Sequence, residues 1–391
     1  MKRALIFLSF VVAMATPAGA TVTEREAVER FYTQELQPEW FGPDFLEQVP
    51  FEQLAPIRDR IAGDLGAFVE ARRDGDRWLA VFEEGRVPTH VALDAEGRLT
   101  TLFLRPPVPN AADLDAVAER FDALAGDGHL LVRVDGEARL SVNADEPFAV
   151  GSAFKLVVLR ALVDAIERGD RSWSDVVTYE DVDRGLATGT LGRWPVGSPL
   201  TLHTAATLMI SQSDNEATDL LIRELGRAAV EAADPSQRNL PFLTTVEAFK
   251  LKDPDNASLL ERWRGGDERA RRDLLGELPL VMELPRPSLF SGDPVATDVE
   301  WFLTATELCE LIAELSDLDL MGVNPGVVDA TNHERVAYKG GSEPGVLNMT
   351  TWVRDDEGRE ICVCATRNAD EPIETTDLSG VVSAAFDVLD R

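Results

Sequence analysis

A serine and a lysine three residues apart open a long apolar segment of this chain of 391 residues. In Ser152-Ala153-Phe154-Lys155 the two side chains lie on one face of the helix that the segment predicts, one turn apart. That helix is apolar on nearly all sides, so we expect it to be buried, and burial lowers the pKa of a lysine. A neutral Lys155 amine could take the proton of Ser152 and leave an oxygen nucleophile. The structural alternative is that Ser152 caps the helix and Lys155 lies at the surface.

A second motif, Ser213-Asp214-Asn215, lies on a loop that we expect between two helices. Its serine could pass a proton to a leaving group, its asparagine could bind a substrate amide, and its aspartate could brace the loop. The alternative is a purely structural role, because serine, aspartate and asparagine are all good helix N-caps.

A third motif, Lys339-Gly340-Gly341-Ser342, is expected to end a strand. Its two glycines would let a substrate backbone approach the strand edge, and Lys339 would place a positive charge there. A peptide-like substrate could lie alongside as an added strand. The structural alternative is a glycine turn beside a surface lysine.

The three motifs, in this order, resemble the signature of class A β-lactamases and penicillin-binding proteins. The resemblance covers roughly residues 113–391. It implies a β-lactamase and transpeptidase-like fold and a hydrolase that forms an acyl-enzyme. The residues to which it assigns a role are Ser152, Lys155, Ser213 and Lys339 in catalysis and Asn215, Gly341 and Ser342 in substrate binding.

The resemblance also implies what each residue does. Ser152 would be acylated, Lys155 would be its base, and Ser213 would relay the proton. Asn215 would hold a substrate amide, and Lys339 would engage a substrate carboxylate. The backbone N–H groups of the nucleophile and of the serine that ends the third motif would form the oxyanion hole.

Three departures from the family pattern matter. Gly340 replaces the usual threonine or serine, which removes a hydroxyl that helps to bind the carboxylate, although Ser342 could substitute. The family's Glu-x-x-Leu-Asn loop is absent, and the nearest candidate for its glutamate, Glu247, also fits a capping box that opens a helix. A long charged insertion at residues 250–300 is expected to reshape or cover the cleft.

Helices followed by strands predict a small additional domain before this part of the chain. The element order resembles the cone-shaped fold of nuclear-transport-factor-like and ketosteroid-isomerase-like domains. We interpret the domain as a passive accessory, since no paired acid and base residues are visible in it. The expected helices cover residues 23–34 and 49–61, and the expected strands cover residues 65–72, 78–82, 87–93 and 99–105.

We therefore predict an α+β protein with a signal peptide at 1–20, a small α+β accessory domain at 23–105, a proline-rich linker at 106–110 and a β-lactamase-like domain at 111–391. In the last domain, strands from both ends with helices between them predict one antiparallel sheet and a helical region. The extra domain and the third motif look like a subgroup of β-lactamase-like hydrolases. That subgroup includes the hydrolase encoded with clavulanic-acid biosynthesis.

The first twenty residues have the basic start, apolar core and small-residue ending of a secretory signal. We expect an exported protein, periplasmic or secreted, with an uncleaved membrane anchor as the alternative. The net charge of −31 argues against nucleic acid and against an anionic membrane surface as partners. A small-molecule substrate is the partner that we expect.

The chain has three cysteines, Cys309, Cys362 and Cys364, and from the odd count we predict no disulfide framework. Cys362 and Cys364 would share a face of a strand, and we interpret them as small buried hydrophobic residues. The four histidines are scattered, and no Cys/His cluster has metal-ligand spacing. We therefore expect neither a metal nor another cofactor.

Together, these observations favour a serine hydrolase with weak β-lactamase or esterase activity, because the missing glutamate loop predicts slow deacylation. The substrate would be a β-lactam, an ester or a D-amino-acid peptide. The alternative is a catalytically weak protein that binds penicillin or cell-wall peptides in the same cleft. An α/β-hydrolase would need Gly-x-Ser-x-Gly, and Gly340-Gly341-Ser342-Glu343-Pro344 lacks the last glycine.

Overall fold

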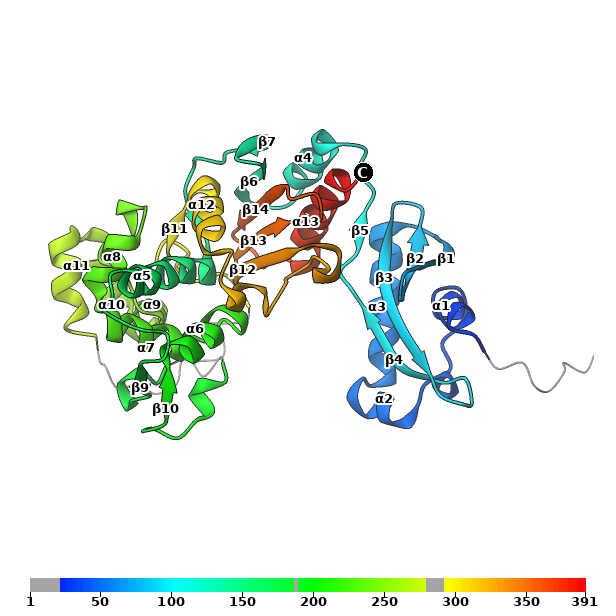
Figure 1. Ribbon diagram of the computed structural model, residues 1–391, viewed down its shortest axis with the longest axis horizontal. Helices are drawn as coiled ribbons and strands as arrows, with labels where there is room; N and C mark the ends of the chain where they lie inside the picture. The colour runs from blue at the N-terminus through cyan, green and yellow to red at the C-terminus, as the bar shows by residue number, and fades with distance from the viewer. Residues whose placement is uncertain (1–21, 186–188, 279–291) are drawn as a thin grey trace, which may run out of the picture. The chain divides into compact units, whose positions relative to one another are not determined.

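The structure, a computed structural model, describes residues 22–185, 189–278 and 292–391. The chain divides into two compact units, Met1–Arg105 and Pro106–Arg391 (Figure 1). The predicted signal peptide, residues 1–20, lies outside the described residues. Among the residues that the structure describes, no helix has both the length and the apolar character that a membrane span requires.

The N-terminal unit is an α+β fold in which helices precede an antiparallel meander, as predicted. Its strands follow the order β1-β2-β3-β4, and each one pairs with the next. The predicted first strand, 65–72, is placed too early, because α3 continues to Leu65 and ends at Gly66, whose φ is 77°. The elements are α1 (Glu24–Thr33), α2 (Pro43–Gln48), α3 (Phe51–Leu65), β1 (Phe68–Asp74), β2 (Arg77–Phe82), β3 (Gly85–Leu93) and β4 (Leu99–Leu104).

The C-terminal unit contains one antiparallel sheet built from segments that lie far apart in the sequence. Its order is β12-β13-β14-β6-β7, and His129 of β6 lies opposite Thr366 of β14. This arrangement confirms the prediction of a single sheet with strands from both ends of the domain. The strands are β6 (Asp127–Val134), β7 (Glu137–Val142), β12 (Arg335–Glu343), β13 (Val346–Arg354) and β14 (Glu360–Asn368).

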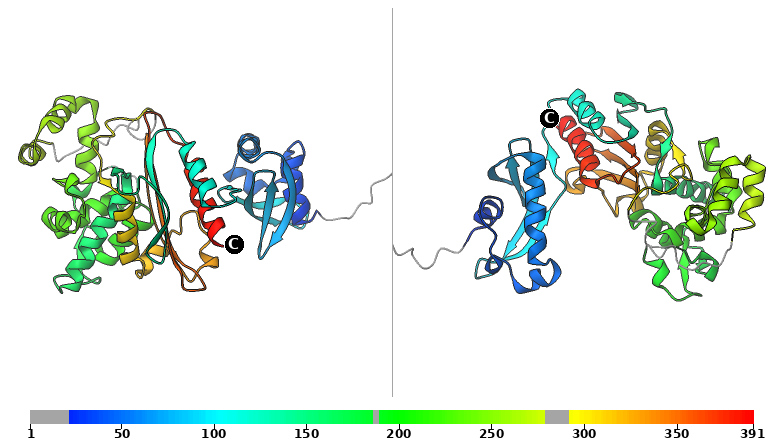
Figure 2. Two further views of the ribbon diagram at one scale, coloured as in Figure 1. Left: turned by 90° about the horizontal axis from the view of Figure 1, so that it is seen from above. Right: turned by 180° about the vertical axis from the view of Figure 1, so that it is seen from behind.

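Helices cover both faces of this sheet (Figure 2). Side chains alternate along β13, so Trp352 packs into one core and Val353 into the other. The core of Val353 is closed by α4 (Leu114–Asp122) and α13 (Thr375–Leu389). The core of Trp352 is closed by α5 (Lys155–Glu167) and α12 (Ala305–Leu315), and α12 packs on the sheet beside β14. The helices on the Trp352 face of the sheet form the start of the helical region.

The helical region carries the first two sequence motifs. The predicted helix from Ser152 begins instead as a 3-10 turn, Gly151–Phe154, and α5 starts at Lys155. The region also holds two-stranded pairs, β8 with β11 and β9 with β10. The remaining elements of the unit are β5 (Val108–Pro109), β8 (Phe148–Ala149), α5 (Lys155–Glu167), β9 (Val176–Thr178), β10 (Pro199–Thr201), α6 (Leu202–Ser211), α7 (Asn215–Leu225), α8 (Arg227–Ala233), α9 (Thr245–Lys252), α10 (Ala257–Gly265), α11 (Glu268–Leu275), β11 (Phe302–Leu303) and α12 (Ala305–Leu315).

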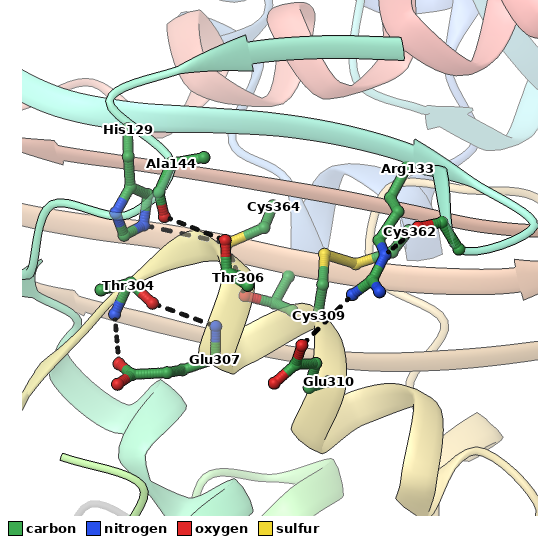
Figure 3. The surroundings of a disulfide bond; sticks show 12 residues. His129, Arg133, Ala144, Thr304, Thr306, Glu307, Cys309, Glu310, Cys362 and Cys364 are labelled. Atoms are coloured by element: carbon green, nitrogen blue, oxygen red, sulfur yellow. Dashed lines mark hydrogen bonds and ion pairs between the residues drawn. A yellow bond between two sulfur atoms is a disulfide. The ribbon is translucent and has the colours of Figure 1, made fainter. Parts of the chain in front are cut away.

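A disulfide joins the sheet to the helix that covers it, and the prediction of no disulfide is therefore wrong. Cys309 of α12 is bonded to Cys362 of β14, with their Cα atoms 5.9 Å apart (Figure 3). An odd count leaves one cysteine over but does not prevent the other two from pairing. Cys362 and Cys364 share the face of β14 that meets α12, as predicted, but only Cys364 is a free buried thiol.

His129 is a structural residue buried beside this helix. Its Nε2 lies 2.6 Å from Oγ1 of Thr366, and its Nδ1 lies 3.1 Å from the carbonyl oxygen of Glu146. Burial lowers the pKa of His129 to about 4, although the contact with Glu146 opposes the shift, so the ring is neutral at pH 7. Within the described ranges, no group of three or more His, Cys, Asp and Glu side chains could hold a metal ion.

Candidate active site

A cavity of about 380 Å³ brings the three motifs together in the C-terminal unit. It lies between the edge strand β12 and the helical region, and its volume suits a small-molecule ligand. Lys155 is the one predicted site residue that does not line the cavity, because it is fully buried beneath it. The predicted site residues that line the cavity are Ser152, Ser213, Asn215, Lys339, Gly341 and Ser342.

Ser152 is presented to the cavity by a rigid turn. Its neighbours on the turn are buried, whereas Ser152 is partly exposed. The turn is fixed from behind, because the N–H of Val150 donates to the carbonyl of Trp301 at 3.0 Å. The Trp301 ring also stacks on Phe154, with the two ring centroids 3.7 Å apart. The position of Ser152 is therefore fixed by packing and hydrogen bonding of the turn that carries it.

Lys155 connects the first motif to the second. Its Nζ donates to the carbonyl of Ser213 and to Oδ1 of Asn215, each at 2.6 Å, and lies 3.3 Å from Oγ of Ser213. Burial lowers the pKa of Lys155 to about 7, and the opposing attraction of nearby carboxylates, Asp219 first among them, only limits the shift. The amine is therefore close to half protonated at neutral pH, as a proton acceptor requires.

Lys339 approaches the same hydroxyl from the sheet. Its Nζ lies 3.1 Å from Oγ of Ser213 and also contacts the carbonyl of Gly340. Burial lowers its pKa well below the usual value, and the charge of Lys155 adds to the shift. The sequence predicted that the strand ends at this motif, but β12 continues through it to Glu343 and stays paired with β13.

The loop of the second motif has a strained backbone at its serine. Ser213 has a φ of 57°, a conformation that residues other than glycine rarely adopt and that is concentrated at functional sites. Asp214 caps α7 by accepting from the N–H of Ala217 at 2.9 Å, and its other oxygen accepts from the N–H of Leu191 at 2.8 Å. This aspartate therefore holds the loop in place while Ser213 points into the cavity.

Gly341 lets the edge strand β12 approach the turn that carries Ser152. A Cβ atom at this position would lie 2.5 Å from the backbone nitrogen of Ser152, which is closer than real Cβ atoms come. A Cβ atom on Gly151 would likewise lie 3.3 Å from the backbone nitrogen of Ser342. The N–H groups of Ser152 and Ser342 thus belong to two backbones in close contact, which is the arrangement that an oxyanion hole needs.

Tyr338 fills the space that Gly340 leaves, and sequence reasoning missed it. A Cβ atom on Gly340 would collide with the hydroxyl of Tyr338 and would lie 3.0 Å from its Cζ. Tyr338 lines the cavity, and burial raises its pKa to about 12, so the hydroxyl keeps its proton. The available signal was the spacing of two residues, which puts both positions on one face of a strand.

Glu247 does not line the cavity. One of its carboxylate oxygens accepts from the N–H of Thr244 at 2.9 Å, within the capping box that opens α9. The other accepts from Arg227 at 2.7 Å. Of the two interpretations that the sequence left open, the geometry favours helix capping.

Two other glutamates do line the cavity, and neither was a candidate from the sequence. Glu300 and Glu343 both bind the ammonium of Lys252. Glu300 is also the one described residue of the insertion at 250–300 that lines the cavity, whereas α10 and α11 do not. The predicted role of this insertion as a cover extends to residues 279–291, which lie outside the described residues.

Residues 111–237 match the model of the Beta-lactamase enzyme family. The match covers about a third of the chain and includes the first two motifs, with Ser152, Lys155, Ser213 and Asn215. No curated protein sequence matches the chain.

Several solved structures are similar to this chain. A β-lactamase from Sphaerobacter thermophilus is 20% identical, with a TM-score of 0.49 over 71% of this chain and 96% of that one. PBP-A is 16% identical, with a TM-score of 0.47 over 72% of this chain and 98% of that one. A β-lactamase from Chitinophaga pinensis is 15% identical, with a TM-score of 0.48 over 71% and 97%.

The protein therefore has an α+β, β-lactamase-like fold, in which an antiparallel sheet packs against a helical region. The match to the β-lactamase family model supports a serine-hydrolase-like function. The family's action on small-molecule β-lactams is in keeping with a cavity of this size.

Proposed function

We propose that the C-terminal unit is a serine hydrolase that forms an acyl-enzyme at Ser152. The observation that carries the proposal is the position of the Ser213 hydroxyl between two buried lysines. It lies 3.3 Å from the Nζ of Lys155 and 3.1 Å from that of Lys339, in the cavity that Ser152 lines. A hydroxyl in that position can move a proton from the base of the nucleophile toward a leaving group.

In the acylation step, the oxygen of Ser152 forms a bond to the substrate carbonyl carbon and gives its proton to the neutral amine of Lys155. The N–H groups of Ser152 and Ser342 stabilise the negative oxygen of the tetrahedral intermediate. The bond from carbon to the leaving nitrogen or oxygen then breaks. Ser213 gives its proton to the leaving group and recovers one from Lys155, so the lysine is neutral again.

The substrate would carry a carboxylate that binds beside Lys339. A carboxylate that binds there should raise the pKa of Lys339 again, because an opposite charge favours the ammonium form of a lysine. The hydroxyl of Tyr338 supports this assignment, since it supplies a donor where Gly340 supplies none. A β-lactam, an ester or a D-amino-acid peptide with a carboxylate fits this description.

The activity is weak toward β-lactams in this proposal. Both oxygens of Glu247 are engaged by Thr244 and Arg227, so the candidate for the family's glutamate cannot activate water. An acyl-enzyme that forms faster than it is hydrolysed is the expected result. If the acyl-enzyme is not hydrolysed at all, the alternative function that the sequence left open applies, namely a protein that binds penicillin or cell-wall peptides.

The protein is exported in this proposal, and the disulfide supports that location. Disulfides persist in oxidising compartments such as the periplasm and are rare in the bacterial cytosol. The Cys309–Cys362 bond therefore agrees with the secretory signal expected at 1–20. The compact N-terminal unit likewise agrees with the subgroup of hydrolases that carry an extra domain, the subgroup of the hydrolase encoded with clavulanic-acid biosynthesis.

The test is covalent labelling with a fluorescent penicillin, followed by the mass of the intact protein. The wild type should gain the mass of one opened β-lactam and lose it slowly. Ser152→Ala should gain none, whereas Ser174→Ala, which changes an exposed serine outside the cavity, should behave like the wild type. Absence of label, together with no hydrolysis of simple esters or of a chromogenic cephalosporin, would overturn the proposal.

A further inference from the structure

Lys252, Glu300 and Glu343 form a buried charged cluster that acylation does not use. Their side chains are 3%, 1% and 8% exposed. The lysine comes from the end of α9, one glutamate precedes β11, and the other ends β12 directly after Ser342. Both glutamates line the cavity of the nucleophile. Charged groups buried at a cavity wall are candidates for a chemical role.

Lys252 is charged in this cluster, whereas Glu343 is neutral. Burial raises the pKa of Glu343 far above its usual value, the charge of Glu300 raises it further, and Lys252 only partly opposes this. Glu343 therefore keeps its proton at neutral pH. Burial alone would lower the pKa of Lys252, but the two glutamates more than offset this, so the lysine stays charged.

One oxygen of Glu300 accepts no hydrogen bond from an N–H group or a hydroxyl. Its Oε1 accepts from Lys252, and the carboxyl group of Glu343 also pairs with Glu300, whereas the buried Oε2 has no other hydrogen-bond partner among the described residues. Buried carboxylate oxygens are normally satisfied, so an unsatisfied one indicates a function or a bound water. Glu300 also borders a second cavity of about 50 Å³, which is large enough for water.

Glu300 is attached to the turn that carries the nucleophile. The next residue in the chain, Trp301, accepts the hydrogen bond from Val150 and stacks on Phe154. Glu343 is attached to the other side of the site, since it directly follows Ser342 on β12. Lys252 binds both glutamates, so the carboxylate of Glu300 is held between the turn of Ser152 and the strand of Ser342.

We propose that Glu300 is the general base that activates water for deacylation, with Lys252 and Glu343 as positioning residues. This inference rests on the proposed function. Water gives a proton to Oε2 of Glu300 while its oxygen forms a bond to the acyl carbon. The bond from that carbon to Oγ of Ser152 then breaks, the serine oxygen regains a proton, and the acid product leaves. Glu300 supplies that proton and returns to its starting charge.

The decisive experiment compares two glutamate variants by the rate at which the acylated protein loses its label. In Glu300→Gln, acylation by a penicillin should stay within about threefold of the wild type, and deacylation should slow by about 10²-fold or more, as the loss of a general base requires. In Glu247→Gln, which keeps the geometry of the capping box, both rates should be unchanged. Glu300→Asp, which keeps a carboxylate, should recover part of the deacylation rate.

The outcomes separate this inference from the function on which it rests. Equal deacylation in Glu300→Gln and the wild type would overturn the role of Glu300 and leave the acyl-enzyme intact. Slower acylation and deacylation together, with no recovery in Glu300→Asp, would indicate a merely structural carboxylate and would also overturn it. A wild type that never acquires a label would overturn the proposed function, and the inference would fall with it.

Discussion

The cavity is bordered by two groups of buried charges that are built in opposite ways. The lysine pair, Lys155 and Lys339, surrounds the Ser213 hydroxyl with two buried amines whose pKa values are lowered. The glutamate pair, Glu300 and Glu343, instead surrounds a lysine. Lys339 and Glu343 are four residues apart on β12, or about 13 Å along the strand.

The difference shows that burial alone does not decide whether a group is reactive. At the lysine pair, burial outweighs the attraction of nearby carboxylates for Lys155 and is reinforced at Lys339 by the charge of Lys155, so the pKa of each amine falls and proton transfer near neutral pH becomes possible. At the glutamate pair, opposite charges more than offset the burial of Lys252, which stays an ammonium, but they do not offset the burial of Glu343, which keeps its proton. The first group suits the formation of an acyl-enzyme, and the second suits the activation of water.

The largest effect should come from removing the base of the lysine pair. Lys155→Met should slow acylation by about 10²- to 10⁴-fold, because it removes the proposed general base for the serine proton. Since the pKa of Lys155 is about 7 and its neutral form is the base, acylation by the wild type should rise with pH through about 7. Stopped-flow labelling across the pH range measures both effects.

Lys250→Met is the matched control for this experiment. Lys250 is also buried, and burial lowers its pKa, but it does not line the cavity. Its removal should leave the pH profile unchanged. If the acylation rate of the wild type did not change between pH 6 and 8, the lowered pKa of Lys155 would not control acylation, and the contrast between the lysine pair and the glutamate pair would not explain the mechanism.

A smaller effect on acylation should follow from pushing strand β12 away from the turn that carries Ser152. The lysine pair and the glutamate pair both depend on the contact between these two segments. Gly341→Ala places a Cβ atom 2.5 Å from the nitrogen of Ser152, so we expect a loss of about 1–3 kcal/mol in the free energy of unfolding. Acylation should weaken as the oxyanion hole widens. Urea unfolding and labelling rates measure these changes. Gly265→Ala, where a Cβ atom meets nothing within 4 Å, should change neither.

The smallest effect should come from the carboxylate contact beside the lysine pair. Tyr338→Phe removes one hydroxyl, so KM for a substrate with a carboxylate should rise about 3- to 10-fold, the equivalent of one hydrogen bond. Values of kcat, and hydrolysis of an ester without a carboxylate, should change little. Tyr179→Phe alters a buried tyrosine outside the cavity and should leave both substrates unaffected. A loss that is equal for both substrates would contradict the assignment.

The parts of the site that a local pattern encodes could be predicted from the sequence. The spacing of Ser152 and Lys155 predicts that they lie about one helical turn apart, and the structure has a 3-10 turn there that leads into α5. The polar run at Ser213 predicts a loop, which the structure also has. The single sheet with strands from both ends of the domain was predictable from the order of the strands. The end of β12 could not be predicted in this way, because the pairing of Gly340 and Gly341 with β13 outweighs the tendency of two glycines to form a turn.

Contacts between distant residues explain what the sequence could not predict. Lys252 binds Glu300 and Glu343, which are 48 and 91 residues away in the sequence, and no local spacing pattern predicts contacts between such distant residues. The disulfide joins positions 53 residues apart, so counting cysteines could not identify the pair. In each case the sheet and the helices that cover it decide which residues meet.

The pairing of β6 with β14 has a consequence for how the protein is made. Residues 127–134 emerge early in synthesis but find their partner strand only when residues 360–368 have followed, with 237 residues between His129 and Thr366. Long-range pairing of this kind is slow, and a partly made chain cannot complete it. The strand that bears Lys339 belongs to the same sheet, so under the proposed function a chain that ends before residue 360 should not acylate. Labelling by a penicillin would then report on chains in which this sheet is complete.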